Sequence, residues 1–142
     1  MIEMFNLLVQ RNNTYKACGG ELTESQDFHP IIYVLQDYSE LYEQLSMDGR
    51  DKLKTLLEKN EPEYRVHVLV CEESGNMGIR TVEAWHKKHC LKGNGVFVGS
   101  GIADQYVLKV SGMDRELRKD IPDDFGFVVK NGIHCLCKPV QG

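Results

Sequence analysis

The chain has 142 residues, a formal net charge of −4 and 42% hydrophobic residues, all ordinary values for a globular domain. The acidic balance gives no overall positive field that would draw the chain onto nucleic acid. The sequence has no run near the roughly eighteen apolar residues of a membrane span, and its start lacks a signal-peptide pattern. We therefore expect a cytoplasmic chain that contacts neither nucleic acid nor membrane directly.

The cysteines indicate the redox compartment. They are odd in number and follow no secretory signal: Cys18, Cys71, Cys90, Cys135 and Cys137. This favours reduced thiols in the cytoplasm over a disulfide framework.

The first half of the chain predicts helices around one buried strand. Apolar residues at helical spacing predict a helix over residues 2–16, closed by Gly19 and Gly20, and a polar loop follows over 21–29. Pro30 leads into the short apolar run 31–35, which is typical of a buried strand of a parallel sheet. Helices are expected over 38–45 and 51–59, with the leucines of the second helix on one side.

The second half predicts strands with one intervening helix. Residues 66–71 form the next buried strand, 72–78 a turn, 79–90 a helix with Val82 and Trp85 inward, and 95–98 a third strand. This order predicts at least three parallel strands joined by right-handed crossovers. A short extended run follows at 105–110. Asn131-Gly132 separates two alternating runs, 126–130 and 133–138, which is a strong signal for a two-residue hairpin.

The strand at 31–35 ends in Gln36 and Asp37. Where such a strand ends in two acidic residues, it is the Walker B strand of a P-loop ATPase: the first carboxylate holds Mg²⁺ and the second polarises the attacking water. Gln36 offers only a neutral amide at the first position, which is a poor partner for a divalent cation. The glycine groups Gly19-Gly20 and Gly93-Asn94-Gly95 are not followed by the Lys-Ser or Lys-Thr of a phosphate loop.

Taken together, these motifs resemble the second half of an FtsK/SpoIIIE-type ATPase domain. They are similar above all to the last ATPase domain of the EssC family, the membrane-anchored ATPases of type VII secretion systems. The resemblance extends from about residue 5 onward. It is carried by residues 31–45, the helix pair, the strand at 66–71, the segment 95–100, the pair Asp104-Gln105 and the segment 122–127.

The resemblance implies a partial P-loop NTPase (RecA-like) three-layer α/β fold with a parallel central sheet and a C-terminal hairpin. The family uses ATP and Mg²⁺, and its phosphate loop would lie before Met1. The metal-binding carboxylate corresponds to Gln36, and only Asp37, at the water-polarising position, keeps its charge. We therefore expect a single degenerate ATPase-like domain over 1–142 that holds no cofactor or metal, has no catalytic residue and is not an enzyme by itself.

The expected role is protein contact. On this interpretation the chain binds domains of a secretion ATPase or its secreted substrates, and a larger membrane-anchored protein would hold it at the inner face of the cell membrane. Self-association is left open. The alternative hypothesis is a fragment of an active ATP-driven translocase of protein or DNA, which would need residues that this chain lacks.

Several residue clusters have rival interpretations. Zinc-type ligands occur in two groups, His86, His89, Cys90 and His134, Cys135, Cys137, but neither has a metal-site spacing, and Cys135 and Cys137 are expected on one strand face as core residues. Cys71 ends a central strand, yet no histidine lies at a catalytic spacing from it. One cluster could form a basic patch, although a solvated helix face is favoured; its members are Arg80, His86, Lys87, Lys88 and Lys92. Another cluster could form a groove for a protein partner, although core packing is favoured; its members are Tyr38, Leu41, Tyr42 and Leu45.

Overall fold

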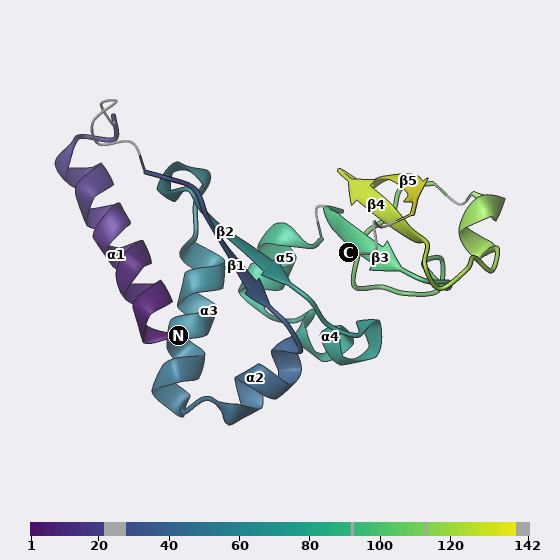
Figure 1. Ribbon diagram of the computed structural model, residues 1–142, viewed down its shortest axis with the longest axis horizontal. Coiled ribbons are helices and arrows are strands. Elements are labelled where there is room, and N and C mark those ends of the chain that lie inside the picture. Colours follow the sequence, from purple (N-terminus) through teal and green to yellow (C-terminus); the bar gives the residue numbers. More distant parts are fainter. Residues whose placement is uncertain (22–27, 92, 113, 139–142) are drawn as a thin grey trace. The chain divides into compact units, whose positions relative to one another are not determined.

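A computed structural model describes residues 1–21, 28–91, 93–112 and 114–138 (Figure 1). The chain forms two compact units, Met1–Glu73 and Ser74–Gly142. Most of the expected loop at 21–29 lies outside the described residues. The single degenerate ATPase-like domain stays a prediction.

The first unit begins with helix α1 (Ile2–Ala17), which confirms the expected helix. Gly19 and Gly20 follow it with φ angles of +68° and +87°, the left-handed conformation that glycine adopts without steric cost. The amide of Gly20 donates to the carbonyl of Tyr15 and so satisfies one of the open carbonyls at the helix end.

Two further helices of the first unit are also confirmed. Helix α2 (Tyr38–Gln44) buries Tyr38 completely, and α3 (Met47–Lys59) buries Leu53, Leu56 and Leu57. The hydroxyl of Ser46 caps α3 by accepting from the amide of Gly49 at 3.2 Å. A short 3-10 turn, η2 (Pro62–Tyr64), then leads into the second strand.

Strands β1 (Ile31–Leu35) and β2 (Val66–Val70) pair in parallel, with Ile31 opposite Val66 and Leu35 opposite Val70. One face of this sheet is buried or half-buried. The other face is exposed, with 68% of Ile32, 60% of Val34 and 52% of Leu69 accessible. The parallel pairing of these two strands is therefore confirmed, but the first unit itself leaves one largely apolar face of the sheet uncovered.

In the second unit, the prediction of a single helix over 79–90 is wrong. The chain forms α4 (Ser74–Arg80), where a turn was expected, and α5 (Ala84–His89). The Thr81 hydroxyl donates to the Gly78 carbonyl, and Glu83 is extended, so the helix breaks between the two segments. Trp85 is buried as predicted, whereas Val82 is 74% exposed because it lies in this break.

The third strand does not join the parallel sheet. Strand β3 (Gly95–Val98) pairs antiparallel with β4 (Gly126–Lys130), which pairs antiparallel with β5 (Ile133–Cys137). Gly126 permits close approach, since a Cβ there would lie 2.7 Å from the Phe97 carbonyl oxygen. The mixed α/β class and the hairpin are confirmed, and the prediction of three parallel strands is wrong. The turn residues Asn131 and Gly132 have φ angles of +53° and +80°, as a type I′ turn requires.

The core of the second unit lies on one face of this antiparallel sheet. Its buried members are Ile102, Leu108, Leu117, Phe127 and Val129. A short 3-10 turn, η3 (Arg115–Arg118), contributes Leu117. The extended run expected at 105–110 is not a strand; these residues form a loop that packs Leu108 into the core.

Candidate functional site

The site predicted from sequence lies at the carboxyl end of β1. Gln36 and Asp37 are both exposed, and Asp37 adopts a left-handed conformation with φ 48° and ψ 55°. Asp37 is the N-cap residue of α2, but its side chain makes no capping hydrogen bond. The edge is held by the backbone: the amide of Cys71 donates to the carbonyl of Leu35 at 2.8 Å.

Glu72 is the residue at this edge that sequence reasoning missed. Its Oε2 accepts a 2.6 Å hydrogen bond from the amide of Ser39, and its Oε1 accepts one from the amide of Glu73 at 2.8 Å. An acidic group near a helix N-terminus is stabilised by the open amides and the helix dipole. The signal was present in the sequence, because the ends of adjacent parallel strands lie at one edge and Glu72 directly follows the strand predicted over 66–71.

This geometry limits the chemistry available at the edge. The Glu72 carboxylate is engaged by two amides, and Gln36 contributes only an amide group, so the two residues that follow β1 directly offer one carboxylate, that of the exposed Asp37. Mg²⁺ binding favours carboxylates together with substrate phosphates. The degenerate Walker B role of Gln36 and Asp37 stays a prediction.

Both glycine groups weighed as phosphate loops have structural roles. Gly19 and Gly20 end α1. Gly93 has φ +70°, and a Cβ there would lie 2.6 Å from the amide nitrogen of Gly132 and even nearer the carbonyl oxygen of Lys109. The Gly132 amide donates to the Gly93 carbonyl at 2.9 Å, and the Ser111 amide donates to the Gly132 carbonyl at 2.7 Å. Gly93 thus joins three loops of the second unit.

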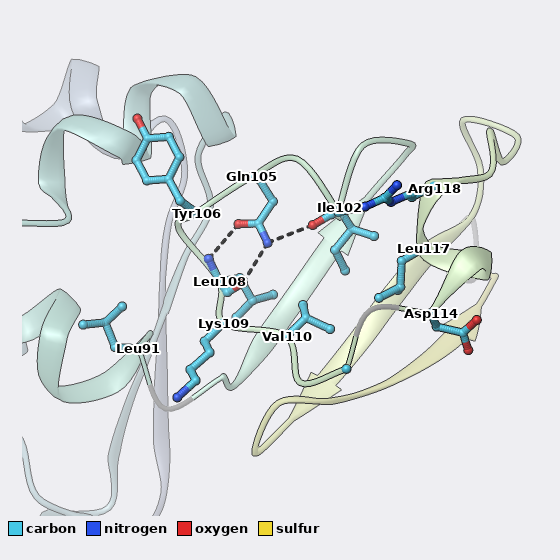
Figure 2. Close-up of a pocket in the computed structure, with 12 residues that line it drawn as sticks. Leu91, Ile102, Gln105, Tyr106, Leu108, Lys109, Val110, Asp114, Leu117 and Arg118 are labelled. Carbon is cyan, nitrogen blue, oxygen red and sulfur yellow. Dashed lines mark hydrogen bonds between the residues drawn. The ribbon is translucent and has the colours of Figure 1, made fainter.

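A groove of about 400 Å³ lies in the second unit (Figure 2). Ile102, Leu108 and Leu117 provide apolar lining, and Lys109, Asp114 and Arg118 provide charge. Gln105 shapes the loop: its amide nitrogen donates to the carbonyls of Ile102 and Leu108, and its oxygen accepts from the amides of Val107 and Leu108. Since Gln105 is fully used within the loop, its role here is structural.

The structure largely separates the residues of the other clusters considered from sequence, namely the zinc-type ligands, the basic patch and the partner groove. His86 is fully buried, while His89 is exposed, and within the described ranges no three His, Cys, Asp or Glu side chains gather as a metal site would require. The basic patch is divided as well, because Arg80 pairs with Glu83 at 3.3 Å and His86 is inside; Lys92 lies outside the described residues. In the proposed partner groove, Tyr38 is core and Leu41, Tyr42 and Leu45 are half-buried.

Two groups of the second unit, the buried His86 and the half-buried Cys90, have shifted pKa values. Burial lowers the pKa of His86, and the Val107 backbone and the Glu83 carboxylate oppose that shift only in part. Burial raises the pKa of the Cys90 thiol. Charged forms of both groups are disfavoured, so each acts as a neutral packing residue near pH 7.

All five cysteines are free thiols. The expectation that Cys135 is a core residue is wrong: its side chain is exposed, and Cys137 is half-buried. The alternation of the strand was right, but the face that carries both cysteines is the face opposite the core, where Val128 is also exposed.

Comparison with known proteins supports the fold at a coarse level. Among the described residues, no helix has the length and apolar character needed to cross a membrane. No family model and no curated protein sequence matches the chain. A solved structure described as the cytoplasmic domain of EssC matches with a TM-score of 0.66 and 14% sequence identity. The match covers 94% of this chain and 25% of that chain, so this chain spans about a quarter of the length of the solved chain that it resembles. The shared fold fits a partial RecA-like domain.

Proposed function

We propose that this chain is a non-catalytic, ATPase-like interaction module of a type VII secretion ATPase. The single observation that carries the proposal is the open apolar face of the β1–β2 sheet. Parallel sheets are normally covered on both faces, yet Ile32, Val34 and Leu69 are each more than half exposed. Such a surface favours a protein partner over solvent.

The fold comparison supports one kind of partner over the others. The matched EssC structure extends well beyond the quarter that this chain covers. The occupant that we favour is therefore another part of a secretion ATPase, which would place the chain in the cytoplasm beside a membrane-anchored protein. A secreted substrate is the other protein partner to be tested.

The carboxyl edge of β1 supports the non-catalytic part of the proposal. Gln36 carries no charge where an active relative would place a metal-binding carboxylate, and the nearby Glu72 is engaged by backbone amides. Phosphoryl transfer depends on charge neutralisation and on positioning. Asp37 alone would have neither a metal nor phosphates to act upon.

The test is a pull-down from cells that contain a type VII system, with the full chain as bait. The proposal predicts recovery of the secretion ATPase or its exported substrates, and loss of that recovery in the double variant Val34→Lys, Leu69→Lys. The control is Asp51→Lys, Thr55→Lys, which adds the same two side chains at exposed positions of α3. If the bait instead retained duplex DNA with a steep salt dependence and no secretion component, the translocase hypothesis would be favoured.

A further inference from the structure

Strand β5 is an uncovered edge of the antiparallel sheet. The strand order is β3-β4-β5, so one side of β5 pairs with β4 and the other side has no strand beside it in the described chain. Natural edge strands are protected by charged residues, prolines or bulges. The five residues of β5, Ile-His-Cys-Leu-Cys, include no Lys, Arg, Asp, Glu or Pro, and Ile133 is 73% exposed.

The alternation of hydrogen-bonded and non-hydrogen-bonded pairs along the sheet determines which backbone groups of β5 point away from β4. The amide of Gly99 donates to the carbonyl of Phe125, so in the same register Phe127 and Val129 face β3. Gly126, Val128 and Lys130 then face β5, opposite Cys137, Cys135 and Ile133. The amides and carbonyls of His134 and Leu136 must therefore point away from the sheet.

These outward groups are self-complementary. If a second β5 runs antiparallel and the two-fold axis passes through Cys135, His134 of each copy faces Leu136 of the other. That register forms four backbone hydrogen bonds, whereas an axis at His134 or Leu136 pairs fewer groups within the strand. The weak contact from the Cys135 thiol to the Leu136 carbonyl, at 3.6 Å, is replaced by a stronger N–H donor.

We infer that β5 is a self-association edge, at which a second copy of this chain adds its own β5 antiparallel with Cys135 facing Cys135. Side chains at this register do not oppose the pairing: Ile133 faces Cys137 of the other copy, and Lys138 is already paired with Asp124 at 2.7 Å. The exposed faces formed by Val96, Val98 and Val128 then continue across both copies. Short edge strands bury little area, so this association is weak.

The register makes a chemical prediction. Directly opposed residues in a non-hydrogen-bonded antiparallel pair have Cα atoms about 4.5 Å apart, which lies within the range of disulfides. Oxidised glutathione would serve as the probe: two Cys135 thiols form one inter-chain disulfide, and the oxidant takes two electrons and two protons and leaves as two glutathione molecules. A chain with Cys135 as its sole cysteine should cross-link rapidly. The matched chain with Cys137 alone should not, since Cys137 faces Ile133.

Charge substitution at Cys135 tests the same contact without disulfide formation, in a chain that keeps the other cysteines. Cys135→Lys places like charges directly opposite one another and should lower the association constant about fivefold in sedimentation equilibrium, as should Cys135→Asp. Mixing the two variants should restore association as a heterodimer. Circular dichroism of each variant verifies folding. Equal cross-linking through Cys137, or no recovery on mixing, would overturn the inference.

Discussion

The sharpest stability prediction concerns Arg11, which is only 7% exposed. Its Nη1 donates to the carbonyls of Tyr64 and Arg65, at 2.7 and 3.2 Å, and its Nη2 donates to the carbonyl of His29 at 2.8 Å. The guanidinium also lies 4.9 Å from the ring centroid of Phe28. Arg11 thus ties α1 to the segments that precede both parallel strands.

Replacing Arg11 with Met keeps the apolar stem but leaves these carbonyls without their charged donor. Hydrogen bonds to charged groups contribute about 1.5 to 3 kcal/mol each, and the three share one side chain, so the expected loss is about 3 to 5 kcal/mol. That is a large fraction of the stability of a small unit. Arg11→Lys should be intermediate, because a point charge cannot reach carbonyls on both segments.

The assay is urea unfolding followed by far-ultraviolet circular dichroism, because α1, α2 and α3 of the first unit contribute most of the helical signal. Gln10→Met is the control, since Gln10 is the exposed neighbour of Arg11 on α1. The control should change the free energy of unfolding by less than about 0.5 kcal/mol. If the free energy of unfolding of Arg11→Met stayed within about 1 kcal/mol of that of the parent chain, Arg11 would not tie α1 to the two strand segments as described.

Three further predictions concern the second unit, and Trp85, the sole tryptophan, reports its unfolding by fluorescence. Gln105→Ala removes four hydrogen bonds to the backbone and should cost about 2 to 4 kcal/mol; a loss below 1 kcal/mol would argue against the role of Gln105 in shaping the loop. Gly93→Ala should prevent folding of the unit, whereas Gly99→Ala, also at positive φ but with open space around it, should cost only about 1 to 2 kcal/mol. Because burial lowers the folded-state pKa of His86 below its unfolded value, the unfolded chain binds the proton first. Stability should therefore be full above the unfolded pKa of about 6.5 and fall as the pH drops, and His86→Leu should flatten this profile.

Local signals in the sequence were sufficient for much of the fold. The glycines after α1, the leucine spacing of α3 and the Asn131-Gly132 turn each depend on neighbours within a few residues, and all three were predicted correctly. The direction in which β3 pairs does not depend on neighbouring residues in the sequence. Its four residues are compatible with a parallel or an antiparallel neighbour, and the choice depends on β4, more than twenty residues downstream.

The site was predicted only in part, for the same reason. Gln36 and Asp37 follow β1 as expected, but the engagement of Glu72 by the amide of Ser39 joins residues 33 positions apart. Cys135 was misplaced because alternation along a strand shows which residues share a face, and not which face meets the core. The structural role of Gln105 depends on a loop geometry that no short motif announces.

The most direct test of the central claim, that this chain does not work as an ATPase, is isothermal titration calorimetry of the full chain with Mg-ATP. We expect no saturable heat, because Gln36 offers no metal-binding charge and Glu72 is held by backbone amides. The variant Gln36→Asp should remain equally silent, since one added carboxylate supplies no phosphate cradle. Saturable micromolar binding of Mg-ATP to the unmodified chain would show that the chain holds a working nucleotide site.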